Sequence, residues 1–270
     1  MTGPLALVTG AASGIGAEVA RRLDRRGYTV IAVDRNDDLA SQAAEDISTS
    51  ALSVGCDLAD RDSVSGLCER IAGEWSDHLE VVVCNAGIIV PRDVADLDET
   101  TVDRHLDIML RAPIQTIRSA VPAMSRRRSG HIMATVSMGG IVPMPGSSAY
   151  SAAKCGLRAF LASLYSEVRQ HDVKVSGIYP SAVDTPMLRH EAASGGSALN
   201  FVGEVQTVND VADAYERALD GGKLEYYVPW SDSLTSRAIT WRLSAIPRML
   251  PMLERLGEKG RAKYLATPSA

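Results

Sequence analysis

Only one of the eight tyrosines in the sequence has a lysine four residues after it. The pair is Tyr150 and Lys154, in a strongly helical stretch, and this spacing places both side chains on one face of a helix. A free tyrosine has a pKa of about 10, so it serves as an acid or base at neutral pH only where positive charge favours the phenolate. Lys154 is placed to supply that charge. The pair therefore predicts proton transfer at Tyr150, with a surface pair of no function as the alternative.

Ser137 precedes Tyr150 by 13 residues and ends an apolar, β-branched run. The connection between them, residues 139–148, is rich in Gly and Pro. A hydroxyl at this place could donate a hydrogen bond to a substrate oxygen and orient that oxygen for proton transfer. A serine that only caps a turn is the alternative.

A glycine-rich turn follows the first apolar run and leads into a helical pattern. Its sequence from Thr9 to Gly16 is TGAASGIG, and the residues that we expect to contact a ligand are Gly10, Ser13, Gly14, Ile15 and Gly16. The glycines allow a tight turn and a close approach to a pyrophosphate, and the helix N-terminus supplies free N–H groups. The spacing differs from G-x-G-x-x-G, and a plain strand-to-helix turn is the alternative.

Asp34 closes the second apolar run, 18 residues after Gly16. A carboxylate at this place accepts hydrogen bonds from a ribose 2′-hydroxyl and repels a 2′-phosphate, so we expect NAD rather than NADP. Arg35 is the counterargument, since it could pair with a phosphate if Asp34 turned away. NADP therefore stays an option.

Small polar motifs follow three further apolar runs. Asp57 could accept from an adenine amino group, and small residues after Asn85 leave room for a cofactor against the backbone, although caps and turns explain these motifs about as well. Two prolines fix the loop 179–186, which could bring Thr185 to a nicotinamide carboxamide. The predicted contacts of these motifs are Asp57, Leu58, Asn85, Ala86, Gly87, Pro180, Val183 and Thr185.

The elements that must position these residues alternate along the chain. Short apolar runs separated by longer helical patterns are typical of βαβ units in a parallel sheet covered on both faces, with ligands at the carboxyl ends of the strands. The predicted strands are 5–9, 29–34, 51–56, 79–84, 131–136, 173–179 and 224–228. The predicted helices lie near 14–26, 60–75, 98–127, 148–171 and 207–220.

Composition narrows the classes of function. At 270 residues with 46% hydrophobic residues, the chain can bury one large core, and we expect a domain over residues 1–230 and an extension over 231–270. Four scattered cysteines indicate neither a metal site nor a disulfide framework. A net charge of −5 argues against a nucleic-acid partner. Without a signal peptide or a long apolar run, a cytoplasmic protein is expected.

Together these motifs resemble the short-chain dehydrogenase/reductase family, in its shorter single-domain branch, over roughly residues 4–230. TGxxxGxG, the Asp after the second strand, NAG, Ser, YxxxK and the P-x-x-x-x-T-P loop occur in family order. The resemblance implies a Rossmann-like, doubly wound parallel sheet, an NAD(P)-dependent oxidoreductase acting on a secondary alcohol or ketone, and a homodimer or homotetramer. It also implies catalysis by Ser137, Tyr150 and Lys154.

Two positions depart from the family pattern. Met109 stands where the family usually has an Asn that completes a proton relay, and residues 86–130 contain no Asn. His105 is a candidate substitute, with a solvated helix histidine as the alternative. Ser181 replaces a common Gly after Pro180. Because of Met109, a dinucleotide-binding protein without turnover remains an alternative. A redox-neutral isomerase or dehydratase on the same scaffold is a further alternative.

Substrate identity should depend on the segment 187–205, which we expect to be a mobile lid or a surface loop, and on Met138, Ile141, Met144 and Met187. Several methionines suggest an adaptable apolar pocket for an apolar or bulky substrate, with core packing as the alternative. The extension carries an apolar stripe flanked by arginines, which Pro247 and Pro251 should break into two segments. We expect this tail to pack on the domain or a neighbouring subunit, with a membrane surface as the less favoured alternative. The stripe consists of Ile239, Leu243, Ile246, Leu250 and Leu253.

Overall fold

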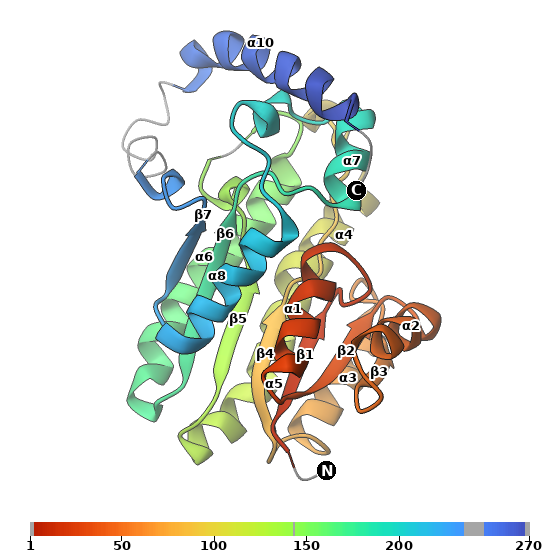
Figure 1. Ribbon diagram of the computed structural model, residues 1–270, viewed down its shortest axis with the longest axis vertical. Helices are drawn as coiled ribbons and strands as arrows, with labels where there is room; N and C mark the ends of the chain where they lie inside the picture. Colours follow the sequence, from red (N-terminus) through yellow and green to blue (C-terminus); the bar gives the residue numbers. More distant parts are fainter. Residues whose placement is uncertain (1–2, 143, 235–245, 268–270) are drawn as a thin grey trace.

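The computed structural model describes residues 3–142, 144–234 and 246–267, and in Figure 1 they form a twisted sheet with helices around it. The sheet is parallel throughout, with strand order β3-β2-β1-β4-β5-β6-β7. This confirms the predicted Rossmann-like fold. The strands are β1 (Leu5–Thr9), β2 (Thr29–Asp34), β3 (Leu52–Gly55), β4 (Leu79–Cys84), β5 (His131–Thr135), β6 (Lys174–Pro180) and β7 (Glu225–Val228).

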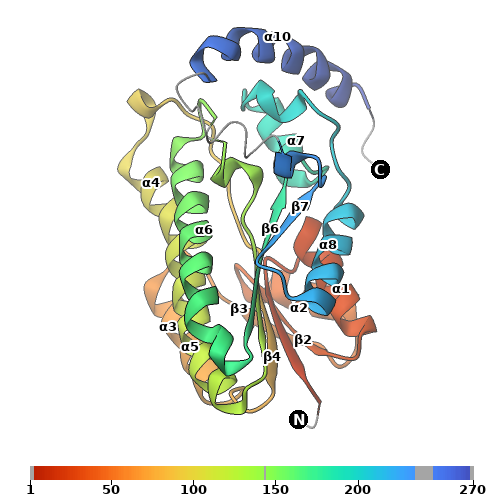
Figure 2. The ribbon, with the colours of Figure 1, turned by 90° about the vertical axis from the view of Figure 1, so that its left-hand side faces the viewer.

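Helices cover both faces of the sheet, as Figure 2 shows from the side. The helices are α1 (Gly14–Arg25), α2 (Asp37–Ile47), α3 (Arg61–Ala72), α4 (Glu99–Leu106), α5 (Ala112–Arg127), α6 (Ser148–Val168), α7 (Pro186–Ala193), α8 (Val208–Gly221) and α10 (Ile246–Leu265). Short helical turns are η1 (Val94–Asp96), the π-helical η2 (Asp107–Arg111), η3 (Met138–Gly140), η4 (Arg169–His171) and η5 (Ala198–Phe201).

The core lies in two layers, one on each face of the sheet. On one face the strands pack against α3, α5 and α6, and on the other against α1, α2 and α8. All five residues of β1 and of β5 are buried, because a parallel strand between two helical layers has no solvent face. The near-continuous apolar runs in the sequence follow from this arrangement.

The strand order reverses between β1 and β4. From β1 the chain builds outward to β2 and β3, and from β4 it builds the other way to β7. The connections leaving β1 and β4 therefore diverge, which opens a crevice beyond their carboxyl ends. The polar motifs predicted at strand ends all fall on this edge.

Two helices that the sequence analysis did not predict flank this edge. Asn36 caps α2, and its side chain accepts a hydrogen bond from Leu39 N at 3.0 Å. The buried residues of α2 are alanines, so its apolar periodicity is weak. Thr185 caps α7, and Pro186 occupies the first helical turn. The segment 187–205 thus contains α7 and η5 rather than a loop alone.

The predicted helix over 98–127 is interrupted. A π-helical turn, η2, separates α4 from α5, and the buried Met109 lies in it. Such turns insert an extra residue into a helix and are frequent at functional sites. The helical phase changes where the family pattern has its Asn.

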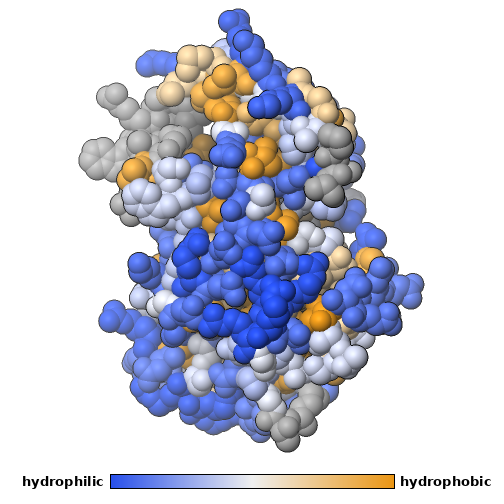
Figure 3. Space-filling view, viewed as in Figure 1, coloured by the Kyte–Doolittle hydropathy of each residue, from blue (hydrophilic) through white to orange (hydrophobic). Residues whose placement is uncertain are grey.

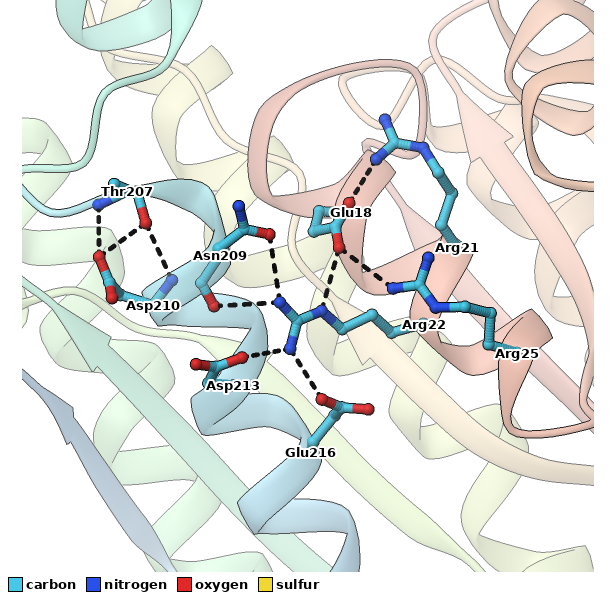
Figure 4. A network of polar contacts seen from close by, with 9 residues as sticks. All are labelled: Glu18, Arg21, Arg22, Arg25, Thr207, Asn209, Asp210, Asp213 and Glu216. Atoms are coloured by element: carbon cyan, nitrogen blue, oxygen red, sulfur yellow. Dashed lines mark hydrogen bonds and ion pairs between the residues drawn. The ribbon is translucent and has the colours of Figure 1, made fainter.

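Arg22 joins the first helix to the last helix before β7. Its guanidinium donates to Glu18 in the same helix and to Asp213 and Glu216 in α8 (Figure 4). The carboxylates raise the pKa of Arg22, although burial opposes this, so its charge is permanent. Arg22 thereby fixes side by side two helices whose bonded residues are 191 and 194 positions apart in the sequence.

Residues Ile246–Leu265 of the extension form helix α10, which continues through Pro251, so the predicted break at this proline is wrong. Pro247 falls in the first turn, where a backbone N–H has no intrahelical partner. Packing compensates for Pro251, because Gly257 and Gly260 lie against the backbone of Ala198 and Phe201. Ile239 and Leu243, like the side chain of Ile246, lie outside the described residues.

One side of α10 faces the body and the other faces solvent. Leu250 and Leu253 are half-buried, whereas Met249, Met252 and Leu256 are exposed. Figure 3 shows apolar surface around α10 and a hydrophilic centre where α1 and α8 lie. Within the described part of the chain, no helix is long and apolar enough to span a bilayer.

Candidate functional site

The turn between β1 and α1 has no room for a side chain at Gly10 or at Gly16, where the next helix turn begins. Gly10 and Gly14 have φ of 69° and 54°, a region that L side chains rarely adopt. A Cβ at Gly16 would lie 2.0 Å from the carbonyl oxygen of Gly10. These glycines bring backbone N–H groups and the start of α1 against one concave surface, which is the cradle that a pyrophosphate requires.

Asp34 lies at the carboxyl end of β2, facing this turn. One carboxylate oxygen accepts from Ala12 N at 2.9 Å and the other from Arg35 N at 2.8 Å. The two amides fix the orientation of the carboxylate and leave further lone pairs for ribose hydroxyls. The geometry therefore fits the ribose contact predicted for Asp34.

Asn85, which follows β4, links this strand to β1 and β5 through side-chain hydrogen bonds. Its amide nitrogen donates to Thr9 O at 3.3 Å, and its amide oxygen accepts from Thr135 Oγ1 at 2.8 Å. Thr135 Oγ1 also lies 2.6 Å from Tyr215 Oη on α8. Asn85 lines the site, but most of its hydrogen-bonding capacity serves the protein itself.

Ser137 has a strained backbone. Its φ is 89° and its ψ is 150°, a conformation that costs a non-glycine residue about 1–3 kcal/mol. Its Oγ accepts from Gly139 N at 3.1 Å, and a Cβ at Gly139 would lie 2.9 Å from Tyr150 Cε1. The strained turn aims the hydroxyl of Ser137 at Tyr150, and Gly139 leaves room for the phenol ring.

Tyr150 and Lys154 project from the first turns of α6 into the same space. Lys154 Nζ lies 5.9 Å from the centre of the Tyr150 ring and donates to Thr135 O at 2.7 Å. Lys154 is 3% exposed and has no carboxylate partner among the salt bridges of the described residues. Burial lowers the pKa of Lys154 to about 8, so its ammonium is only modestly favoured at neutral pH.

Burial is the largest influence on the pKa of Tyr150. Burial raises the pKa of Tyr150 to about 12, and the carboxyl of Glu191 contributes to this rise. A hydrogen bond with Ser137 opposes it, whereas Lys154 has no resolved effect. In this structure the lysine alone therefore does not make the phenol acidic, and the lowering of its pKa by Lys154 together with the charge of oxidised nicotinamide stays a prediction.

Two pockets that share one wall occupy the crevice. We call the one that contains Tyr150 the tyrosine pocket and the one that contains Asp34 the aspartate pocket. Their shared wall consists of Gly10, Ser13, Ala86 and Gly87. The other predicted residues of the tyrosine pocket are Gly14, Ile15, Asn85, Ser137, Tyr150, Lys154, Pro180, Val183 and Thr185. Those of the aspartate pocket are Asp34, Asp57 and Leu58.

The residues that line this pair of pockets fit a dinucleotide. The glycine turn lies in the middle, Asp34 lies at one end, and Tyr150 lies at the other. Gly16 lines neither pocket, and its role is to let α1 approach the turn. Arg35 and Arg104 also line the aspartate pocket, so positive charge is present there beside the carboxylate.

Met109, which departs from the family pattern, and its candidate substitute His105 have structural roles. Met109 is buried, and its sulfur would lie 3.4 Å from a Cβ at Gly87. His105 is buried rather than solvated: one ring nitrogen pairs with Thr101 O and the other accepts from Val90 N. Both nitrogens contact the backbone, so His105 does not replace the missing Asn.

Several residues that the sequence analysis did not single out also line the tyrosine pocket. Glu191 and Asn200 come from α7 and η5, and Ser147 directly precedes α6. The Ser147 hydroxyl is buried without a hydrogen-bond partner among the described residues. Of the four predicted substrate contacts, Met144 and Met187 line the pocket, whereas Met138 and Ile141 pack in the core.

Comparisons with known proteins place these observations in context. The family model described as short chain dehydrogenase matches residues 4–195. A cis-4-hydroxycyclohexanecarboxylate dehydrogenase from Sinomonas cyclohexanicum is 35% identical over 216 residues, which is 78% of this chain and 86% of the relative.

Two solved structures share the fold. A short-chain dehydrogenase from Sphingobium yanoikuyae in complex with NADPH has a TM-score of 0.75 and 22% identity, covering 92% of this chain and 95% of that one. A 3-ketoacyl-(acyl-carrier-protein) reductase from Brucella melitensis complexed with NADH has a TM-score of 0.72 and 24% identity, with 83% and 97% covered.

Proposed function

The chain belongs to the short-chain dehydrogenase/reductase family, and we propose that it is an oxidoreductase that interconverts a secondary alcohol and a ketone with NAD as cofactor. The observation that carries the proposal is the placement of Ser137, Tyr150 and Lys154 around one pocket that continues into a dinucleotide-shaped groove. Members of this fold bind NAD(P), and the glycine cradle and Asp34 of this chain fit that group.

Each residue of the proposed catalytic set has a distinct task. When bound, the nicotinamide ring accepts or supplies the hydride at C4. Tyr150 removes the hydroxyl proton of the alcohol, or returns a proton to the ketone oxygen in the other direction. Ser137 donates a hydrogen bond to that same oxygen, and Lys154 holds the ribose next to the ring.

The pKa of Tyr150 implies that the protein alone does not activate it. Burial raises this pKa to about 12, and Lys154, whose own pKa is about 8, offers a weak counter-charge. We therefore assign the larger part of the activation to the positive charge of the oxidised nicotinamide. Proton removal by Tyr150 is thus coupled to the presence of the oxidised cofactor.

Asp34 supports NAD over NADP. Two backbone amides orient its carboxylate towards the aspartate pocket, where it would repel a 2′-phosphate. Arg35 and Arg104 line the same pocket and are the features that favour NADP. Because Asp34 is held in place and Arg35 is exposed, we give the carboxylate more weight.

The walls of the tyrosine pocket support a substrate with an apolar body. Ile89, Met144, Met187 and Leu188 contribute side chains to these walls. A relative named for a dehydrogenase of a ring alcohol, at 35% identity, makes cyclic secondary alcohols suitable first probes.

A screen of secondary alcohols and ketones with NAD(H) and NADP(H), followed at 340 nm, tests the proposal. Turnover in the wild type, loss of at least about 1000-fold in Tyr150→Phe and unchanged cofactor affinity are expected. Tyr165→Phe, on the same helix outside the pocket, is the matched control and should retain full activity. Equal turnover in wild type and Tyr150→Phe would refute the proposal, and cofactor binding without any net absorbance change would favour the redox-neutral alternative.

A further inference from the structure

Glu191 places a carboxyl group inside the tyrosine pocket. It is the only Asp or Glu among the described residues that line this pocket, and it is 8% exposed. It lies on α7, which packs beyond the carboxyl ends of the strands (Figure 1). Tyr150 lines the same pocket.

No cation of the described residues neutralises Glu191. Arg189 pairs with Asp184, and Arg261 pairs with Glu258 and with the carbonyl oxygen of Gly196. The partners of Glu191 are the amide of Asn200, which donates to Oε1 at 2.9 Å, and the backbone N–H of Ser197. Burial raises the pKa of Glu191, which is the cost of keeping a carboxyl group here without a counter-charge.

The surroundings hold the Glu191 side chain in place. Gly196 N donates to Glu191 O at 2.9 Å, and a Cβ at Gly196 would lie 2.1 Å from Glu191 Cγ. From the other side, α10 covers this turn: Arg261 bonds Gly196 O, and a Cβ at Gly257 would lie 2.0 Å from Ala198 O. The carboxyl group is therefore preorganised, as a recognition group must be.

The neighbours of this carboxyl group in the pocket are mostly apolar. Met187 and Leu188 flank it in sequence, and Ile89 and Met144 line the same cavity. An apolar ligand that filled this cavity would remove water from the carboxyl group without replacing its hydrogen bonds, which is unfavourable. A ligand with a donor at that point restores the lost bonds.

We propose that Glu191 determines substrate specificity by accepting a hydrogen bond from a hydroxyl or amino group that the substrate carries away from its reacting carbon. This inference rests on the proposed function and names the substrate class: ketones and alcohols with an apolar body and a second, distal donor. It also excludes a class, because Glu191 disfavours substrates with a carboxylate at the same end. The buried, unpartnered hydroxyl of Ser147 is a second polar group of the same pocket.

The test compares matched ketones that differ only in one distal group, with 4-substituted cyclohexanones and open-chain analogues bearing methyl, hydroxyl, ammonium or carboxylate. For each variant the ratio of kcat/KM between two ketones is measured, since this ratio is independent of the fraction of folded enzyme. In the wild type, kcat/KM for the hydroxyl and ammonium ketones should exceed kcat/KM for the methyl ketone by about 10-fold or more. The carboxylate ketone should have the lowest kcat/KM.

Three variants locate the effect. In Glu191→Gln, kcat/KM for the ammonium ketone should fall by about 10-fold relative to kcat/KM for the hydroxyl ketone. In Glu191→Leu, the methyl ketone should have the highest kcat/KM. Glu204→Gln removes an exposed carboxyl group of the same segment outside the pocket and should keep the wild-type ratios.

Unchanged ratios in Glu191→Leu would overturn the inference and leave Glu191 as a structural cap of residues 197–200, while the proposed function would stand. Preference for the carboxylate ketone in the wild type would overturn it as well. If no ketone in any series is reduced in a Tyr150-dependent manner, the proposed function fails and the inference fails with it.

Discussion

The two ends of the sheet differ in how they use polar side chains. At the carboxyl ends, Ser137 is strained and Lys154 is buried without a counter-charge. At the amino ends, His131 bonds Ser176 between neighbouring strands, and Arg127 ties the end of α5 to the carbonyl oxygens of Ser76 and Leu79. A residue with φ of 89° and a buried ammonium thus lie at the end that we assign to chemistry, whereas the side chains named at the amino end bond neighbouring elements.

The contrast between the two ends of the strands predicts where substitutions change activity and where they change stability. Strained or desolvated groups persist only where the surrounding structure imposes them, and they cluster at functional sites. Substitutions at the carboxyl ends should therefore lower turnover without loss of stability, and substitutions at the amino ends should do the reverse.

Lys154→Met gives the largest expected effect. Turnover should fall by about 1000-fold, because the ribose contact and the ammonium next to Tyr150 are lost. The free energy of unfolding should rise at neutral pH, because burial lowers the pKa of Lys154 to about 8 and the folded state no longer holds a desolvated ammonium. Urea unfolding at pH 7 and steady-state kinetics measure both quantities. A clear loss of stability in Lys154→Met would contradict the expectation that substitutions at the carboxyl ends lower turnover without loss of stability.

His131 tests the opposite end through pH. Burial lowers the pKa of His131 to about 4 from its ordinary value of about 6.5, so the unfolded chain binds a proton that the folded chain does not. The contribution of His131 to the free energy of unfolding is fully present above pH 6.5. About 3 kcal/mol of this free energy is lost as pH falls from 6.5 to 4. In His131→Gln this part of the acid dependence should disappear while kcat at pH 7 stays unchanged.

Unfolding free energies from urea titrations between pH 4 and 7 measure the loss. His78→Gln, at an exposed histidine, is the control and should retain the wild-type pH dependence. The same slope in wild type and His131→Gln would show that other groups cause the acid dependence.

Asp34→Asn tests which residue at the carboxyl end determines the choice between NAD and NADP. The variant keeps the size of the side chain but removes the charge that repels a 2′-phosphate, so the ratio of NAD to NADP affinity should fall by about 10-fold, or 1.4 kcal/mol. Cofactor titration by protein fluorescence measures the ratio. Asp38→Asn, exposed on α2, should leave it unchanged. An unaltered ratio in Asp34→Asn would assign cofactor choice to Arg35 and Arg104.

Ser137→Gly and Ser137→Ala give the smallest effect and separate strain from chemistry. Both remove the hydroxyl, so both should lower turnover. Only glycine relieves the φ of 89°, and it should be more stable than the alanine variant by about 1 kcal/mol after its greater unfolded-state entropy is included. Paired urea unfolding curves test this. An alanine variant as stable as the glycine variant would mean that the turn relaxes at no cost.

The sequence predicted the carboxyl end well because its signals are local. A strand in a parallel sheet ends where its apolar run ends, so Thr9, Asp34 and Ser137 could be placed from the apolar pattern alone. The four-residue spacing of Tyr150 and Lys154 defined one helix face before any tertiary contact was known.

The substrate side could not be predicted in the same way. Glu191 enters the pocket because α7, η5 and α10 pack on one another, and no periodicity links residues 191, 200 and 261 in the sequence. Pro251 in α10 illustrates the same limit, because tertiary packing overrides the local preference to break the helix. The burial that raises the pKa of Tyr150 could not be read from the sequence either, since spacing indicates a neighbouring charge but not the packing around it.

The most direct test of the account is a crystal structure with NAD(H) bound. We predict the adenine ribose at Asp34, the pyrophosphate on the Gly10–Gly16 turn, and the hydroxyl of Tyr150 within hydrogen-bonding distance of the space above nicotinamide C4. A dinucleotide bound with its nicotinamide ring outside the tyrosine pocket, or a Tyr150 hydroxyl turned away from that ring, would contradict the central claim that this phenol exchanges the substrate proton.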